Sequence, residues 1–365
     1  MSANLVKYNS LKMYKYLKKC WYNSVKLFLK ISLNFYAKKI KIYGRENIPK
    51  KGAVLFAINH PNALMDPLFV TAFNPRENHF LVRADVFKKP LIKKALASLN
   101  LMPIYRIRDG RSQLSNNEEV FEKCFNILKR KETLIIFPQG GHSRDRNIKT
   151  LSKGFTRIVF GALEQNTDLD IAVIPVGVTY QNSSIYPSKV CVQFGKVIDS
   201  RIIFTENPKP KAINILKSEV SNQLKKLTVH IPDDENYTST LQKLNTANVD
   251  FTDVDSVNQM ISENNFPRAV KKSINLLKPI YYLILINGII PYLIWKKMAK
   301  NIGEIEFVDT MKYGVNVIAF PIFYGLQTFL ISFFFGWEIA GIYWLASYFL
   351  VFLYTKFSST NTEEN

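Results

Sequence analysis

Between residues 41 and about 204, short apolar runs alternate with longer stretches whose apolar positions recur every three or four residues. The runs predicted as strands are 52–58, 79–82, 133–138, 171–178 and 190–195, and the helices predicted between them include 120–131 and 153–166. Continuous apolar runs are typical of strands buried on both faces. The pattern therefore predicts an α/β fold, with a mostly parallel sheet flanked by helices.

The N-terminal segment has a different, amphipathic pattern. Over residues 11–40, apolar positions recur at helical steps, at Tyr14, Leu17, Trp21, Val25, Phe28 and Phe35. A second stripe with similar spacing carries Lys12, Lys15, Lys19, Lys26 and Lys30. Aromatic residues on one face and lysines on another are typical of a helix lying in a membrane interface. The alternative is a helix packed on its own domain with a solvated lysine face.

The C-terminal segment is the most apolar part of the chain. Residues 313–337 carry no charge and are long enough to span a bilayer, and 339–355 follow closely. The earlier apolar stretch 280–295 is shorter and contains Pro291. Lysines flank these stretches, at 296, 297, 300, 312 and 356. We predict a transmembrane hairpin formed by the last two stretches, with 280–295 interfacial or re-entrant, because a third span would move the 296–312 lysines to the opposite side.

These patterns divide the chain into four parts. Residues 1–44 are basic interfacial helices, 45–204 the catalytic domain, 205–275 a polar connector that is helical or partly disordered, and 276–365 the membrane region. A helix is predicted over 212–227 in the connector.

Charge narrows the choice of partner. The net charge is +20 with 47% hydrophobic residues, and residues 1–51 hold thirteen basic residues and one acidic residue. This balance favours an anionic surface, either a membrane or nucleic acid. No zinc finger, basic zipper or RNA-binding signature accompanies the charge, so we expect a phospholipid membrane and no nucleic acid. The three scattered cysteines predict neither a disulfide framework nor a metal site.

Candidate chemistry begins at "INHPNALMDP" (58–67), where His60 follows a predicted strand and Asp66 comes six residues later. An imidazole is the usual general base near neutral pH, and a nearby carboxylate fixes its tautomer. No nucleophile elbow of the GxSxG type is present, so the base is predicted to act directly on a substrate hydroxyl. The alternative is a loop that holds both residues for structural reasons.

Further cations and glycines follow other predicted strands. Arg106 ends "LMPIYR", and "FPQGGHSRDR" (137–146) places Gly140, Gly141, His142, Arg144 and Arg146 after the 133–138 strand. Lys153 then begins a predicted helix. Guanidinium groups, glycine backbone and helix N-termini all favour phosphate.

The ordered set "NHPNALMDP", "LMPIYR", "FPQGGHS" and "VIPVGV" resembles the four motif blocks of the glycerolipid acyltransferase family, the PlsC-like lysophosphatidate and glycerol-3-phosphate acyltransferases. The likeness covers roughly residues 45–200. It implies transfer of a fatty acyl group from a coenzyme A or carrier-protein thioester to a hydroxyl of glycerol 3-phosphate or 1-acylglycerol 3-phosphate. It also implies that His60 is the base, that Asp66 is its partner, and that Arg106, the 140–146 loop and Lys153 hold the acceptor phosphate.

Two features depart from the family pattern. Five residues separate His60 from Asp66, where four are commonest, and this longer spacing is similar to the branch that acylates glycerol 3-phosphate or dihydroxyacetone phosphate. The third block reads Phe-Pro-Gln-Gly, so Gln139 replaces the usual glutamate and His142 the usual arginine. A catalytically impaired, lipid-binding pseudoenzyme is therefore the alternative function.

The sequence thus predicts a membrane-bound acyltransferase of phospholipid synthesis that needs no metal or other cofactor besides its acyl thioester co-substrate. Its catalytic domain is expected on the cytoplasmic side of the membrane. In the expected reaction no acyl-enzyme forms, and backbone N–H groups near the His60 corner stabilise the oxyanion.

Overall fold

The computed structural model of the chain describes residues 2–105, 116–270 and 274–360. Its centre is an eight-stranded sheet in the order β1-β7-β6-β2-β5-β3-β4, with β8 paired to β6. All neighbouring strands on this path are parallel except β6 and β7, and β8 also runs antiparallel to β6. The strands are β1 Lys39–Tyr43, β2 Ala53–Ile58, β3 Asn78–Arg83, β4 Leu101–Ile104, β5 Thr133–Ile136, β6 Ile171–Tyr180, β7 Lys189–Phe194 and β8 Ile198–Asp199. The predicted fold class is confirmed.

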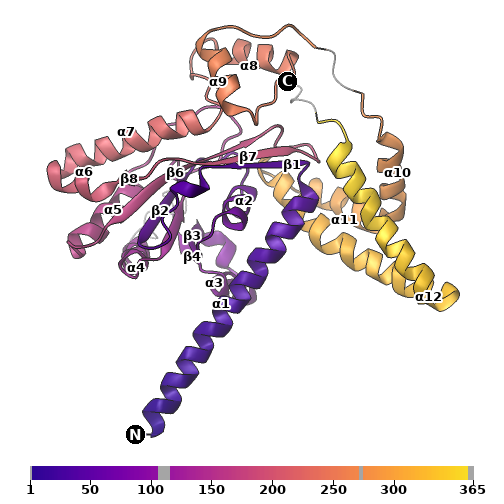
Figure 1. The fold of residues 1–365 in the computed structure, drawn as a ribbon, viewed down its shortest axis with the longest axis horizontal. Coiled ribbons are helices and arrows are strands. Elements are labelled where there is room, and N and C mark those ends of the chain that lie inside the picture. Colours follow the sequence, from indigo (N-terminus) through magenta and orange to yellow (C-terminus); the bar gives the residue numbers. More distant parts are fainter. Residues whose placement is uncertain (1, 106–115, 271–273, 361–365) are drawn as a thin grey trace.

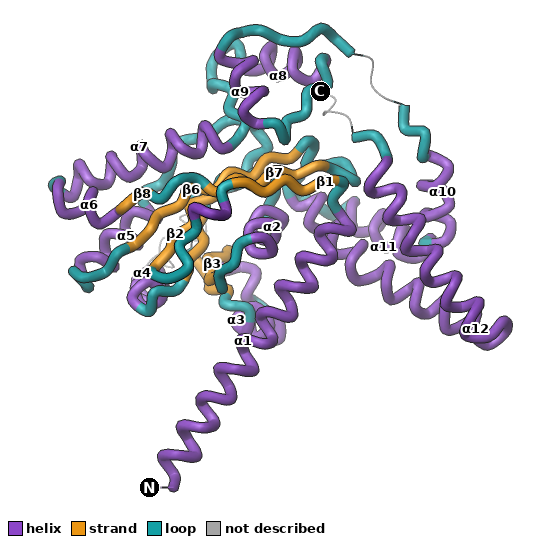
Figure 2. Tube along the Cα trace, in the orientation of Figure 1, coloured by secondary structure: helices purple, strands orange, loops and turns teal. Residues whose placement is uncertain are grey.

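Helices cover both faces of this sheet (Figure 1; Figure 2). One face packs against α4 (Asn116–Lys129), α5 (Gly154–Gln165) and α7 (Lys209–Leu227), and the other against α2 (Met65–Phe73) and the end of α1 (Ser2–Tyr36). The central strand β2 shows why its sequence does not alternate: Leu55 points into the first core and Phe56 into the second. Both side chains are fully buried. The helices α3 (Pro90–Ser98) and α6 (Ser200–Glu206) complete the domain.

Helix α1 leaves the domain along its N-terminal half (Figure 1). Near its C-terminal end, Leu33 and Tyr36 are buried in the core beside α2. Farther out, Tyr14, Leu17 and Trp21 are more than half exposed, at 66%, 58% and 51%. The predicted amphipathic segment is therefore one helix that ends at Tyr36, and the apolar stripe of its outer part is largely exposed. The prediction that residues up to 44 lie outside the catalytic domain was wrong, because Lys39–Tyr43 form the strand β1 and pair with β7.

The segment predicted as a connector is folded onto the domain. Helix α7 covers the sheet, while α8 (Tyr237–Thr246) and α9 (Val254–Ser262) enclose a small core of their own. That core includes Val229, Ile231 and Phe251, which lie outside these helices. Loop residues supply much of this core, so its apolar positions do not recur at a regular helical or strand period. The hydrophobic pattern of the sequence therefore does not predict this core.

The C-terminal region consists of bent helices. Helices α10 (Lys278–Asn287) and α11 (Ile289–Ala299) meet at 95°. Helix α12 (Phe307–Phe357) is interrupted at Gly336, whose φ of 78° and ψ of 167° are not helical. Its two arms lie side by side, since Tyr343 donates to Gln327 at 2.9 Å and the rings of Tyr324 and Tyr348 are 5.8 Å apart.

This geometry matches the predicted hairpin over 313–355. Within the described part of the chain, α12 is the one helix long and apolar enough to cross a membrane, and the bent α10–α11 pair would add a second candidate if counted as a single span. That the hairpin crosses a bilayer, and that 280–295 is interfacial or re-entrant, stay predictions.

Candidate active site

His60 and Asp66 meet at the carboxyl end of the central strand. His60 lies two residues past β2, and Asp66 lies in the first turn of α2. Between them, Ala63 has a φ of 32°, a conformation that residues other than glycine rarely adopt. The tight corner brings Nδ1 of His60 within 2.8 Å of Oδ2 of Asp66. With Nδ1 occupied, the ring nitrogen Nε2 is the one that can take a proton from a substrate.

Asp66 is held by two further donors. Its side chain is fully buried, and it accepts hydrogen bonds from the backbone N–H of Asn62 and from the hydroxyl of Tyr180, each at 2.8 Å. Burial and the adjacent Asp66 charge raise the pKa of Tyr180 well above its ordinary value, so its hydroxyl remains a donor. The carboxylate is thus fixed from three sides, and the orientation of the imidazole follows from it.

A second buried carboxylate supports this corner from the C-terminal region. Asn62 donates from its side chain to Oδ2 of Asp309 at 2.9 Å, and the hydroxyl of Tyr36 donates to Oδ1 of the same residue. Burial, followed by the nearby Asp309 charge, raises the pKa of Tyr36 well above its usual value. Tyr36 and Asp309 therefore tie α1 and α12 to the loop of the His–Asp pair.

The other side of the His60 ring faces the third motif block. Phe137 stacks on it with ring centroids 3.9 Å apart, and the ring of His142 lies nearly perpendicular to it with centroids 5.5 Å apart. His142 in turn contacts Glu304 at 2.6 Å, and Arg83 contacts Glu304 at 3.2 Å. The hydrogen bond from His142, supported by Arg83, lowers the pKa of Glu304. These contacts place the segment before α12 beside the imidazole.

The two described arginines of the 140–146 loop already have protein partners. Arg144 donates to the Ser184 hydroxyl and to the carbonyl of Ile305. Arg146 donates to the carbonyls of Tyr180 and Gln181, each at 3.1 Å, and lies 3.5 Å from the ring centroid of Phe251. Both guanidinium groups therefore connect loops of the protein to one another. These contacts explain the two arginines structurally, without a role in phosphate binding.

The remaining predicted phosphate residues lie around the same loop. Gly140 and Gly141 are exposed after β5, Gly140 with a φ of 73°, and Gln139 is partly buried in the same turn. Lys153 is exposed immediately before α5. The backbone N–H of Ser143 donates to the carbonyl of His60 at 3.0 Å, so this loop and the His60 corner are in direct contact. Arg106 lies outside the described residues.

Comparison with known proteins places this geometry in a family. Residues 39–179, which contain His60, Asp66 and the 140–146 loop, match the family model "Acyltransferase". These residues form a domain of the acyltransferase family.

Several curated relatives share part of this domain. The chain is 25% identical over 122 residues to glycerol-3-phosphate O-acyltransferase 2 of Saccharomyces cerevisiae, covering 32% of this chain and 16% of that protein. It is 26% identical over 152 residues to the chloroplastic 1-acyl-sn-glycerol-3-phosphate acyltransferase LPAT1 of Arabidopsis thaliana, covering 41% and 38%. For the 1-acyl-sn-glycerol-3-phosphate acyltransferase of Borreliella burgdorferi the identity is 29% over 142 residues, covering 39% and 53%.

The matched segments therefore span from about a sixth to about half of these relatives. Among solved structures, the crystal structure of the 1-acyl-sn-glycerophosphate acyltransferase PlsC from Thermotoga maritima superposes with a TM-score of 0.45 at 20% identity, covering 59% of this chain and 82% of that one.

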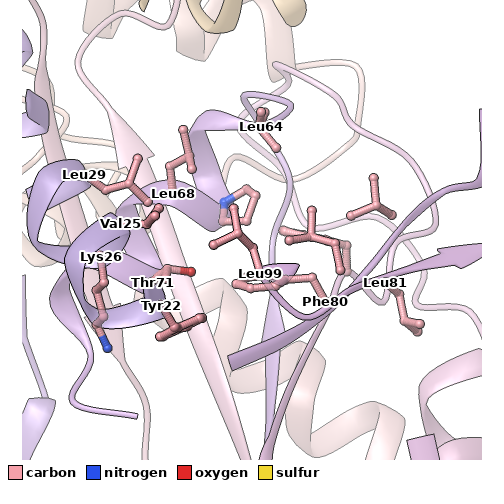
Figure 3. A pocket seen from close by; sticks show the side chains of 14 residues that line it. Tyr22, Val25, Lys26, Leu29, Leu64, Leu68, Thr71, Phe80, Leu81 and Leu99 are labelled. Carbon is pink, nitrogen blue, oxygen red and sulfur yellow. The ribbon is translucent and has the colours of Figure 1, made fainter. Parts of the chain in front are cut away.

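An apolar pocket adjoins the His60 corner of the acyltransferase domain (Figure 3). It lies between α1, α2 and the strands β3 and β4, and Phe137, which stacks on His60, forms part of its wall. Figure 3 shows Val25, Leu29, Leu68 and Phe80 surrounding the same space. The other lining residues are Tyr22, Lys26, Leu64, Pro67, Thr71, Leu81, Val82, Leu99 and Leu101.

Several residues of this site carried no signal in the sequence. Tyr180 lies two residues beyond the fourth block, and Asp309 lies 247 residues from its partner Asn62. A buried tyrosine near a strand end and an aspartate near an apolar segment are common in proteins without an active site. Tyr180 and Asp309 are recognised as parts of the site only because the fold brings them next to Asp66 and Asn62.

Proposed function

We propose that the chain is a membrane-bound enzyme that transfers a fatty acyl group from an acyl thioester to a hydroxyl of a glycerol-phosphate acceptor. The observation that carries the proposal is the 2.8 Å contact between His60 and Asp66, with Asp66 buried and bound by two other donors. The relatives named above act on glycerol 3-phosphate or on 1-acyl-sn-glycerol 3-phosphate, and both acceptors fit this chemistry.

In the proposed reaction, Nε2 of His60 removes the proton of the acceptor hydroxyl as its oxygen attacks the thioester carbonyl. Asp66 stabilises the imidazolium that forms. The tetrahedral intermediate then collapses, the carbon–sulfur bond breaks, and the sulfur leaves as a thiol after receiving the proton from His60. The products are the oxygen ester and the free thiol, and the imidazole returns to its neutral form.

The pocket in Figure 3, with a volume of about 80 Å³, is proposed to contact the part of the donor acyl chain next to the thioester, because its apolar wall includes the ring that stacks on His60. For the acceptor phosphate, the family resemblance assigns Arg106, the glycine loop and Lys153. The exposed position of Lys153 beside the start of α5 supports its assignment. Arg144 and Arg146 are assigned to loop structure first, because their donors are bound to carbonyl and hydroxyl groups of the chain.

An acyl-transfer assay tests the proposal. Purified full-length protein in phosphatidylcholine vesicles is given acyl-CoA or acyl carrier protein thioester, together with glycerol 3-phosphate or 1-acylglycerol 3-phosphate. We expect thiol release that depends on one of the acceptors and on His60. Thiol release that is independent of every acceptor would indicate a thioesterase and would refute the proposal.

Gln139 motivates the second candidate, a lipid-binding protein without turnover. An amide keeps one acceptor oxygen and the shape of the glutamate it replaces, but it lacks the charge. Gln139→Glu is expected to change kcat by less than about tenfold, because His60, Asp66 and the donors to Asp66 are all in place without it. If the wild type is silent with every acceptor and Gln139→Glu is active, the pseudoenzyme is the correct assignment.

The outer half of α1 is proposed to lie on the membrane surface. A peptide of residues 2–36, whose one tryptophan is Trp21, is expected to bind vesicles containing about 30% anionic lipid, with a blue shift of its fluorescence. About 0.5 M salt should weaken this binding, because attraction of the lysines to headgroups is screened. Glutamate at Lys12, Lys15 and Lys19 should abolish it. An unshifted spectrum with the unaltered peptide would contradict the interfacial role.

A further inference from the structure

A large apolar cavity lies outside the segment that matches the family. It has a volume of about 690 Å³ and is lined by the inner half of α1, the bent pair α10–α11 and both arms of α12. Phe28, Phe35, Tyr36, Leu285, Phe320 and Tyr324 are among its walls. The volume is within the range of sites that bind small molecules, and the lining is mostly apolar with a few polar groups, as in such sites.

The surroundings of the cavity indicate its ligand. The helices that form it carry exposed apolar side chains on their outer faces, such as Ile286 at 71%, Ile318 at 61% and Phe349 at 58%. Exposed apolar surface of this kind suits contact with lipid hydrocarbon. One cation, Lys312, is among the lining residues; its Nζ donates to the carbonyl of Ser184 at 3.0 Å and lies 5.4 Å from the ring centroid of Trp295, which lines the cavity too. The mostly apolar lining, set among helices with apolar outer faces, matches the acyl chain of a bilayer lipid.

A path of hydrogen bonds connects the cavity wall with the catalytic pair. Tyr36 donates to Asp309, and Asp309 accepts from the side chain of Asn62. The backbone N–H of Asn62 donates to Asp66, which contacts Nδ1 of His60. This path reaches His60 at Nδ1. The cavity is therefore connected to the Nδ1 side of the imidazole, where Asp66 binds. The acceptor hydroxyl has to approach the opposite ring nitrogen, Nε2.

We infer that this cavity binds one acyl chain of a bilayer phospholipid, as a site separate from those of donor and acceptor. The bound chain packs against Tyr36 and holds its hydroxyl on Asp309, and so supports the loop of the His–Asp pair. The inference that a lipid chain binds depends on the cavity alone. The inference that this binding affects turnover rests on the proposed function. Membrane lipid would then be required for full activity in addition to being the phase in which the substrates lie.

Photo-cross-linking tests the binding in the full-length chain. The protein is placed in nanodiscs of phosphatidylcholine that include a phosphatidylcholine with a diazirine in the middle of one chain. Leu285→Trp fills the cavity, and Ile286→Trp is the matched control, since the neighbouring residue faces outward. We expect adducts on the lining residues of α10 and α12, reduced about fivefold or more by Leu285→Trp and unchanged by Ile286→Trp. If Leu285→Trp does not fold, the pair Leu285→Phe and Ile286→Phe replaces it.

Adducts confined to outward-facing residues, or equal adducts in the two variants, would overturn the inference.

Turnover provides the second readout: Leu285→Trp should lower kcat by about threefold or more at unchanged acceptor KM. A raised KM for 1-acylglycerol 3-phosphate with kcat unchanged would show that the acceptor's own chain uses the cavity, which overturns the separate site. A wild type inactive with every acceptor would refute the proposed function, and the adducts would still decide the binding.

Discussion

Replacing His60 by alanine is expected to lower kcat for acyl transfer by about 10³- to 10⁴-fold, the effect of losing a positioned general base. The imidazole of His60 lies 2.8 Å from the fully buried carboxylate of Asp66, whereas His79 and His142 contact the more exposed carboxylates of Glu132 and Glu304. The fold should persist, because the side chain of His60 is partly exposed, with 16% of its surface accessible. The measurement is kcat with saturating donor and acceptor.

The matched control is His230→Ala. His230 is also partly buried and accepts a hydrogen bond from the backbone of Ile148, but it lies on the segment between α7 and α8. Its removal should leave kcat within about threefold of the wild-type value. A His60→Ala enzyme that retains kcat within about tenfold of the wild type would exclude His60 as the base.

Asp66→Asn is expected to cost about 10³-fold in kcat, although the new side chain has nearly the same shape. The amide NH₂ of an asparagine that faces Nδ1 donates to it, so the imidazole proton moves to Nε2. A histidine in that tautomer cannot accept the hydroxyl proton. The rate should fall while KM for the donor changes little, since the apolar pocket for the acyl chain is intact.

Tyr180→Phe separates this effect from loss of structure. It removes one donor to Asp66 and retains the carboxylate and its contact with His60, so kcat should fall by about tenfold or less. Comparable losses in Asp66→Asn and Tyr180→Phe would mean that the carboxylate acts by packing alone and would contradict the assigned role.

The sheet and the His–Asp corner were predictable because their causes are local. A run such as residues 53–58 is buried on both faces, so its composition alone indicates a central strand. A parallel sheet collects the carboxyl ends of its strands at one edge, which brings the loops after β2 and β5 together. The hydrogen bond from Ser143 to His60 is the direct result.

The rest of the site depends on contacts between distant segments. Asp309 reaches Asn62 from the start of α12, and Glu304 reaches His142 from the segment before it. The partners of Arg144 and Arg146 likewise come from loops whose approach is fixed by packing. An arginine in a glycine-rich loop has the same sequence signature whether it binds a phosphate or a backbone carbonyl, and only the folded chain distinguishes the two.

The central claim is that this chain moves an acyl group onto a glycerol-phosphate hydroxyl with His60 as the base. Its most direct test is mass spectrometry of the lipid product formed from a deuterated acyl thioester, by the wild type and by His60→Ala side by side. The account predicts a deuterated mono- or diacylglycerol phosphate from the wild type and only trace amounts from His60→Ala. Equal product from both proteins, or none from the wild type with either acceptor, would contradict it.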